Sequence, residues 1–366
     1  MTMPPLVPPA GGLDADALAR YSRQLLLGEI GVSGQRSLAA ARVLVIGAGG
    51  LGAPVLLYLA AAGVGTIGVV DFDVVEKSNL HRQVVHRDAD IGRPKVDSAA
   101  DAVAALNPSV TVRTHHVRLD QDTVGDLLAG YDLVIDGSDN FATRYLVNDA
   151  CVAVGKPLVW GSVLGFAAQV AVFWDAAPDG SGVQLRDVFP EPPPEGSVPS
   201  CAEAGVVGAL CGQAGSVLAM EAIKLITGIG RPLLGRVLVI DALAGRWDQV
   251  EIRRGDPGPG SSAPVAVTPP VPTVSPIEVD LPVAGSIFLL DVRGPDEFAA
   301  ERVTGSVNLP LPDLLAGDLD GVPDDRPILV ICRSGRRAEV AAASLEARGY
   351  RDVRVLAGGL DSLAPA

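Results

Sequence analysis

The sequence predicts an α/β protein: a Rossmann-like, doubly wound and mostly parallel sheet, followed by a second, smaller α/β domain. Two observations lead to this fold class. Short apolar runs typical of buried strands alternate with helical patterns along most of the chain. A Pro- and Gly-rich stretch at residues 255–274 then interrupts the alternation, which resumes behind it on a smaller scale.

The first domain is expected over residues 13–254. A helical pattern at 13–40 precedes a continuous apolar strand at 42–47 that ends in glycine. A helix at 54–62 and a second strand at 66–71 complete a βαβ unit with a glycine-rich turn. Three further segments repeat the strand pattern: 132–136, 157–160 and 236–241.

The second domain is expected over residues 275–366. The linker before it, 255–274, is rich in Pro, Gly, Ser and small apolar residues, which predicts an extended and mobile connection. Four elements are expected in this domain: strands at 288–292, 328–332 and 353–356 and a helix at 338–348.

Composition and charge exclude several classes of protein. Of the 366 residues, 48% are hydrophobic and 20% charged, which is not a disordered composition. The net charge of −14 leaves no basic footprint for nucleic acid or for an anionic membrane. An acidic surface would suit a partner with a basic face, although a charge excess often serves solubility alone.

The sequence carries no recognisable targeting signal. Residues 1–12 lack the basic start and apolar core of a signal peptide and are expected to be disordered. The apolar run at 54–70 is broken by glycines, so it is typical of a helix, a turn and a strand rather than a membrane span. The four cysteines form no disulfide framework. We therefore expect a cytoplasmic protein with free thiols.

The turn after the first strand is a candidate phosphate loop. It reads GAGGLG and contributes four glycines: Gly47, Gly49, Gly50 and Gly52. Glycines let the backbone approach phosphate oxygens, and the following helix supplies N–H donors. Nicotinamide and flavin oxidoreductases have such a turn with an acid at the end of the next strand. Asp71 and Asp73 satisfy that rule, so the loop alone leaves a dehydrogenase open.

Polar and cationic residues downstream favour a triphosphate. They are Ser78, Asn79, Arg82, Gln83 and Lys95. A dinucleotide site needs no such cluster around its diphosphate. Nucleotidyl transfer does, because charge develops on the leaving pyrophosphate. Each cation alone would be an ordinary surface charge, but together they indicate nucleotidyl transfer.

Asp139 is the candidate magnesium ligand. Together with Asn140 it follows the strand at 132–136, and the carboxyl ends of strands in a doubly wound sheet face the ligand crevice. Mg²⁺ prefers oxygen ligands and phosphates. The alternative is an aspartate that caps the next helix.

Taken together, these motifs resemble the ubiquitin-activating-enzyme-like adenylyltransferases, in particular the activators of the molybdopterin-synthase and thiamine pathways. The resemblance covers residues 15–255. The segments that carry it are RYSRQ (20–24), GAGGLG (47–52), DFDVVEKSNLHRQ (71–83), GRPK (92–95), DGSDNFATRY (137–145) and PSCAEAG (199–205).

This resemblance implies ATP and Mg²⁺ as cofactors and a ubiquitin-like sulfur-carrier protein ending in Gly-Gly as the partner. Attack of the carrier carboxylate on the α-phosphate would give an acyl-adenylate. Arg23 would reach into the neighbouring subunit's site, which makes a homodimer the active unit. The residues that would hold ATP and Mg²⁺ are Gly50, Asp71, Asn79, Arg82, Lys95 and Asp139.

The cysteines depart from part of the family pattern. Many members hold a structural zinc with two C-x-x-C pairs, which would fall near 184–187 and 256–260. Neither segment contains cysteine, so no structural zinc is expected.

Cys201 follows a proline-rich stretch at 189–199 that is long enough to cross the site as a lid. In relatives this cysteine can join a thioester or an acyl disulfide. The alternative is a small buried residue, as assumed for Cys151 and Cys211.

The second domain places Cys332 at a strand-to-helix turn. The residues of the turn are Arg333, Ser334, Gly335, Arg336 and Arg337. Backbone N–H groups and the positive helix end lower the pKa of such a thiol and would stabilise an anionic persulfide. Three arginines add positive potential. A cysteine phosphatase would need an arginine where Ala338 stands. A buried structural cysteine is the other alternative.

These residues resemble the rhodanese domains. The matching segments are DVRxxxEF (291–298), GSVNLP (305–310), CRSGRRA (332–338) and the glycine pair 358–359. Two positions depart from the pattern, since Arg302 replaces the usual histidine and Leu363 stands where a tryptophan is frequent. Little follows Leu363, so the terminal helix is expected to be short.

The two resemblances predict carrier adenylation followed by sulfur transfer from a Cys332 persulfide, giving a carrier thiocarboxylate. The sulfur donor would be thiosulfate or a cysteine desulfurase. The molybdenum cofactor, thiamine and cysteine or thiolation pathways stay open. A conjugation activator with a thioester at Cys201 and a scaffold with a decayed site are the alternatives. The rhodanese domain argues against the first, and the intact phosphate-contacting residues against the second.

Overall fold

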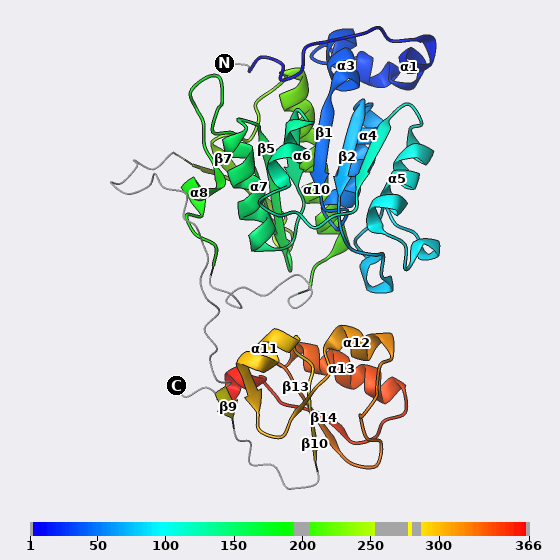
Figure 1. Ribbon diagram of the computed structural model, residues 1–366, viewed down its shortest axis with the longest axis vertical. Helices are drawn as coiled ribbons and strands as arrows, with labels where there is room; N and C mark the ends of the chain where they lie inside the picture. Colours follow the sequence, from blue (N-terminus) through cyan, green and yellow to red (C-terminus); the bar gives the residue numbers. More distant parts are fainter. Residues whose placement is uncertain (1–2, 194–204, 253–276, 280–286, 364–366) are drawn as a thin grey trace, which may run out of the picture. The chain divides into compact units, whose positions relative to one another are not determined.

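A computed structural model of the chain describes residues 3–193, 205–252, 277–279 and 287–363. The chain divides into two compact units, residues 1–261 and 262–366 (Figure 1). The expected linker at 255–274 and Cys201 lie outside the described residues.

The first unit is built on an eight-stranded sheet in the order β3-β2-β1-β4-β5-β6-β7-β8. Strands β3 to β5 in this order are parallel, and the last three join antiparallel. The prediction of a mostly parallel, doubly wound sheet is therefore confirmed. The strands are β1 (Arg42–Ile46), β2 (Thr66–Val70), β3 (Thr111–His115), β4 (Leu133–Asp136), β5 (Leu158–Leu164), β6 (Ala167–Phe173), β7 (Arg236–Asp241) and β8 (Arg246–Glu251).

Helices cover both faces of this sheet (Figure 1). Helices α3, α4, α5 and α10 pack on one face, and α6 and α7 on the other. Strand β1 shows why, because Val43 and Val45 point into the first core while Leu44 and Ile46 point into the second. The helices are α1 (Ala15–Arg20), α2 (Ser22–Leu25), α3 (Gly31–Ala40), α4 (Gly52–Ala62), η1 (Lys77–Asn79), η2 (Asp88–Asp90), α5 (Lys95–Leu106), α6 (Val124–Ala129), α7 (Phe141–Ala153), α8 (Leu185–Val188) and α10 (Gly208–Thr227).

Helix α10 belongs to the core of this unit. It is the one helix among the described residues that is long and apolar enough to cross a membrane, and 56% of its apolar window is buried inside the protein. The run at 54–70, which the sequence singles out, forms most of α4, a turn and β2 as expected. The turn is made by Gly63, whose φ of 81° suits glycine.

The N-terminal segment, which the sequence predicts to be disordered, contacts the end of α10 at Leu6 and Val7. The Leu6 N–H donates to the Leu225 carbonyl at 2.9 Å, and Val7 is only 7% exposed. Composition did not reveal this, because the segment is held by tertiary contacts with the end of α10.

The second unit is a smaller α/β domain, as predicted. Its four-stranded parallel sheet has the order β12-β10-β13-β14, and β9 pairs with β11 beside it. The core contains Leu290, Val330 and Leu345. The elements are β9 (Ile277–Val279), β10 (Phe288–Asp291), α11 (Pro295–Ala300), β11 (Glu301–Val303), β12 (Val307–Asn308), α12 (Leu311–Ala316), β13 (Ile328–Ile331), α13 (Arg336–Ala347), β14 (Val353–Val355) and η3 (Leu360–Leu363).

Candidate functional site

A cavity lies at the carboxyl ends of β1, β2 and β4. Its walls include the last residues of β1 and β2, Ile46 and Val70, and Gly137 just after β4. Strands β2 and β3 lie on one side of β1, and β4 and β5 on the other. Such a reversal of strand order is where doubly wound sheets bind ligands.

Most of the residues predicted to bind nucleotide line this cavity. They are Gly47, Gly49, Gly50, Asp71, Asp73, Arg82, Gln83, Lys95, Asp139 and Asn140. These residues lie at 47–50, 71–73, 82–83, 95 and 139–140 in the sequence, and folding brings them together around one cavity.

Four predicted residues do not line it. Ser78 donates its hydroxyl to Glu76 Oε2 at 3.1 Å, and the buried Asn79 accepts from the Glu76 N–H. Gly52 packs in the turn, since a Cβ there would lie 1.8 Å from the Gly47 carbonyl oxygen. Arg23 is exposed on α2. A role of Arg23 in a neighbouring subunit's site therefore stays a prediction.

The phosphate loop is held by the acid at the end of β2. Asp71 Oδ2 accepts from the Ala48 N–H at 2.8 Å, and Asp71 Oδ1 accepts from the Asp73 N–H at 2.9 Å. Gly47 adopts a φ of 87°, which a side chain would strain. Asp71 thus supports the loop as well as lining the cavity.

Four cations line the cavity: Arg82, Lys95, Arg118 and Arg144. Lys95, with a side chain only 8% exposed, pairs with Asp73 at 2.8 Å. Arg82 donates to the Ser78 carbonyl at 2.9 Å. Arg118, missed from sequence, lies 3.8 Å over the Phe72 ring. Arg118 follows the parallel strand β3. Its position just after a strand is the sequence feature that could have identified it as a site residue.

The loop after β4 is anchored by buried polar groups that the sequence analysis did not single out. Asp136 is fully buried and accepts from the Ser138 N–H at 2.9 Å, and Arg144 donates to the Ser138 carbonyl at 3.0 Å. Burial raises the pKa of Asp136, and the charge of Arg144 opposes this shift. The next residue, Asp139, lines the cavity, while Asn140 caps α7 through Thr143. The helix cap is thus Asn140 rather than Asp139.

The described cysteines of this unit are Cys151 and Cys211, and both are buried. Burial raises the pKa of the Cys151 thiol, which makes it unreactive. Cys211 is also buried but lines the cavity, with its Sγ 3.0 Å from the position of a Cβ on Gly50. Of the two segments considered for zinc, 184–187 lies at α8, and 256–260 lies outside the described residues.

The second unit places Cys332 at the end of β13, fully buried. Its Sγ accepts from the Ala338 N–H at 3.4 Å, in the first turn of α13. Gly335, with a φ of 89°, makes the turn before the helix. The sulfur therefore meets a helix N-terminus as expected.

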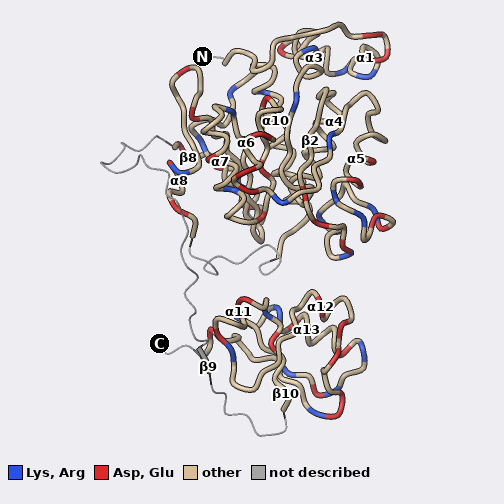
Figure 2. The backbone as a smooth tube through the Cα atoms, viewed as in Figure 1, with Lys and Arg blue, Asp and Glu red and all other residues tan. Residues whose placement is uncertain are grey.

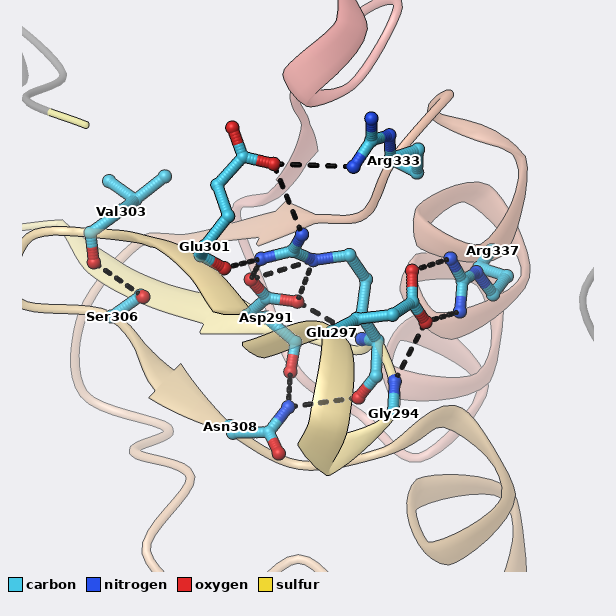
Figure 3. Close-up of polar contacts among 10 residues, drawn as sticks. Asp291, Gly294, Glu297, Glu301, Val303, Ser306, Asn308, Arg333 and Arg337 are labelled. Carbon is cyan, nitrogen blue, oxygen red and sulfur yellow. Dashed lines mark hydrogen bonds and ion pairs between the residues drawn. The ribbon is translucent and has the colours of Figure 1, made fainter. Parts of the chain in front are cut away.

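Two of the arginines expected to add positive potential around Cys332, Arg333 and Arg337, are paired with carboxylates. Arg337 is paired with Glu297 at 2.7 and 2.9 Å (Figure 3). Arg333 contacts Glu301 at 3.3 Å and Asp361 at 3.0 Å. Their charges are balanced by carboxylates from α11, β11 and η3, which the sequence places 28 to 40 residues away.

The DVR segment forms a buried ion pair that the sequence analysis did not single out. Arg293 and Asp291 are both fully buried, with the shortest contact at 2.7 Å. Arg293 also donates to the Glu301 carbonyl at 2.6 Å, and Asn308 donates to the carbonyls of Asp291 and Arg293 (Figure 3). This network ties β10, β11 and β12 together beside the cysteine loop.

The glycine pair 358–359 packs against the backbone of the cysteine loop. A Cβ on Gly359 would lie 2.3 Å from the Arg333 carbonyl oxygen, so no side chain fits there. Leu360 donates its N–H to the Cys332 carbonyl at 3.0 Å. Of the two departures, Arg302 lies over the Phe298 ring, and Leu363 ends η3.

Comparison with known proteins now decides the family. The ThiF family profile matches residues 21–260, and the rhodanese-like domain profile matches residues 278–365. The chain belongs to the ThiF family. A probable adenylyltransferase/sulfurtransferase, MoeZ of Mycobacterium tuberculosis, is 49% identical over 98% of this chain and 96% of its own length.

Two further relatives have names that give both of these activities or the first alone. The adenylyltransferase and sulfurtransferase MOCS3-1 of Zea mays is 37% identical over 97% of this chain and 83% of its own length. A sulfur carrier protein adenylyltransferase of Thermus thermophilus is 52% identical over 65% of this chain and 89% of its own length. This ThiF-family chain is accordingly an enzyme, an adenylyltransferase and sulfurtransferase that uses ATP. The dehydrogenase, phosphatase and conjugation alternatives are not favoured.

Solved structures show the same fold over about two thirds of the chain. PaaA is 24% identical with a TM-score of 0.57, covering 67% of this chain and 76% of its own. E. coli MccB is 22% identical with a TM-score of 0.58, covering 64% of this chain and 72% of its own.

Proposed function

We propose that this enzyme adenylates the C-terminal Gly-Gly carboxylate of a small ubiquitin-like sulfur-carrier protein and converts it to a thiocarboxylate. The observation that carries the proposal is the presence of two complementary sites on one chain. One is a cavity lined by Arg82, Lys95 and Asp139, and the other is a cysteine, Cys332, at a helix N-terminus. The relative named as a sulfur carrier protein adenylyltransferase supports the partner.

In the first step, a carboxylate oxygen of the carrier attacks the α-phosphorus of ATP, and pyrophosphate leaves. Arg82 and Lys95 stabilise the charge that develops on the phosphates. The exposed carboxylate of Asp139 lines the same cavity and suits Mg²⁺, which prefers oxygen ligands. Bound there, Mg²⁺ would neutralise part of the phosphate charge.

In the second step, the terminal sulfur of a Cys332 persulfide attacks the acyl carbon, and AMP leaves. The product is an acyl disulfide between the carrier and Cys332. A second thiol then displaces the carrier thiocarboxylate and forms a disulfide, which a cellular thiol reduces. Cys201 is the candidate for that second thiol. Because Cys332 is fully buried, its loop must open for either sulfur donor to reach it.

Several finer features belong to the same proposal. The donor is thiosulfate or the persulfide of a cysteine desulfurase, and the carrier serves the molybdenum cofactor, thiamine or cysteine and thiolation pathways. The enzyme works in the cytoplasm. Acidic and basic residues are interspersed along both units (Figure 2), which suits a protein partner better than nucleic acid.

We further propose that the active unit is a homodimer in which Arg23 reaches the other subunit's nucleotide site. Next to the exposed Arg23, Leu26 is 75% exposed and Leu27 53% exposed, which suits a covered surface. Mixing Arg23→Ala and Asp139→Ala subunits should restore part of the activity, because one hybrid site is intact. No recovery despite demonstrated subunit exchange would refute the role in trans.

Mass spectrometry of candidate carriers tests the overall reaction. Each carrier is incubated with the enzyme, ATP and either thiosulfate or a cysteine desulfurase with cysteine. The carrier that gains the mass difference between sulfur and oxygen identifies the partner. A carrier that is adenylated but never gains sulfur would leave only the first half of the proposal standing.

A further inference from the structure

The peptide backbone of Ala48, inside the phosphate loop, is held from both sides. Its N–H donates to Asp71 Oδ2 at 2.8 Å, and its carbonyl lies 2.9 Å from His86 Nε2. Ala48 is fully buried, and His86 is only 6% exposed. Asp71 was predicted from the sequence, whereas His86 lies between two motifs and carries no local signal.

The contacts of His86 place a hydrogen on Nε2. Because a carbonyl oxygen only accepts, Nε2 carries the hydrogen that bonds to Ala48. The other ring nitrogen, Nδ1, lies 2.9 Å from the Ser98 hydroxyl oxygen, and Ser98 also bonds the Asp90 carboxylate. Ser98 lies one turn into α5, the helix that begins with Lys95. The imidazole therefore connects the phosphate loop to the helix that delivers a cavity cation.

Burial and one neighbouring cation favour the neutral ring, and two neighbouring carboxylates oppose them. Burial lowers the pKa of His86, and the charge of Lys95 acts in the same direction. The bond to the Ala48 carbonyl and the carboxylates of Asp71 and Asp90 oppose this shift without reversing it.

The carbonyl of Ala48 and the N–H of Gly49 belong to the same planar trans peptide, so they point in opposite directions. Fixing the carbonyl toward His86 therefore turns the Gly49 N–H away from it. Gly49 lines the cavity, and its N–H has no hydrogen-bond partner within the described part of the chain. A free backbone donor at this position is what a phosphate oxygen requires.

We propose that His86 is a positioning residue for adenylyl transfer, which orients the Ala48–Gly49 peptide so that its N–H faces the triphosphate of ATP. His86 touches no substrate and acts through the loop. Glycines on both sides of Ala48 leave this peptide free to rotate, so an external hydrogen bond has to hold it. The inference concerns the first half-reaction and does not depend on the identity of the carrier.

Two substitutions at this position separate positioning from packing. The amide nitrogen of glutamine in His86→Gln reaches about as far as Nε2 and can donate to Ala48. The shorter asparagine of His86→Asn cannot. His86→Asn should raise the Kd and KM for ATP roughly 10-fold, as expected for loss of one buried hydrogen bond. His86→Gln should recover most of that loss. The KM for the carrier should stay unchanged in both variants.

The measurements are nucleotide titration without carrier and ATP–pyrophosphate exchange with carrier, with thermal unfolding of each protein. His115→Asn is the matched control, because this histidine bonds Tyr131 at 2.7 Å and does not line the cavity. Equal ATP affinity for the Gln and Asn variants, or a change in carrier KM alone, would overturn the proposal.

If His86→Asn does not fold, Ser98→Ala replaces it. Ser98→Ala removes the partner that orients the ring and should weaken ATP binding by a smaller factor, and unchanged affinity would equally overturn it.

Discussion

At the scale of single residues, the nucleotide site depends on charges that other side chains balance. Lys95 is nearly buried, yet it keeps its place because Asp73 neutralises it at 2.8 Å. Arg144 similarly compensates the buried Asp136. The carboxylate of Asp139 differs from these, since it is exposed and lines the cavity. It is therefore available to a ligand.

Replacing Asp139 by Ala should lower ATP–pyrophosphate exchange by about 10²-fold or more, because charge stabilisation of the leaving pyrophosphate is lost. The rate is measured with a carrier ending in Gly-Gly over a range of Mg²⁺ concentrations. Asp126→Ala, at another exposed aspartate on α6, is the control and should exchange at the normal rate. Undiminished exchange in the Asp139 variant would remove this residue from the site.

Replacing Glu301 by Gln should raise kcat/KM for thiosulfate several-fold. Arg333 is 57% exposed and contacts Glu301 at 3.3 Å, so removing that carboxylate leaves more positive charge for a small anionic donor. Thiosulfate:cyanide sulfurtransfer measures the effect, which should shrink at high ionic strength. Asp352→Asn breaks another exposed ion pair, with Arg354, and serves as the control. A rate that stays constant would mean that Arg333 does not attract the donor.

At the scale of secondary-structure elements, the two units are stabilised in different ways. The strands of the first unit are buried on both faces, and apolar packing suffices to hold them. The second unit has a smaller apolar core and adds a fully buried ion pair between Asp291 and Arg293. Removing one partner of such a pair leaves an uncompensated buried charge.

Arg293→Met should therefore destabilise the second unit by about 3–5 kcal/mol. Denaturant unfolding followed by a probe within residues 287–363 measures the change. Arg326→Ala is the matched control, because Arg326 and its partner Asp325 are 52% and 65% exposed and such a pair contributes little. A loss equal to that of the control would show that the buried network does not hold β10 to its neighbours.

At the scale of the whole molecule, the two activities reside in separate compact units. Cys332→Ser should keep carrier adenylation and abolish thiosulfate:cyanide sulfurtransfer. It should also block thiocarboxylate formation from thiosulfate, although inorganic sulfide would still attack the adenylate directly. Cys201→Ser, the companion variant, should slow only thiocarboxylate formation. Normal thiocarboxylate formation from thiosulfate in the Cys332 variant would show that the second unit is not the sulfur donor.

Much of the nucleotide site was predictable because its motifs follow strands. Asp71, Asp139 and the glycine loop each come after a parallel strand, and such residues meet at one edge of the sheet. His86 could not be found this way, because its role depends on facing Ala48, 38 residues earlier. The pairing of Arg337 with Glu297 was equally hidden, since 40 residues separate them.

The sequence by itself determined the two-domain α/β architecture, the phosphate loop, the acids after its strands and the cysteine at a strand-to-helix turn. These features depend on local periodicity and on neighbouring residues, which the order of amino acids states directly. Only the tertiary structure decided which charged side chains are exposed to a ligand and which are buried or paired with an opposite charge. It left Asp139 exposed, buried Asp136 beside Arg144 and balanced Arg333 and Arg337 with carboxylates. The physical reason is that an ion pair or a buried hydrogen bond depends on distances of a few ångströms across the fold, and spacing along the chain does not specify them.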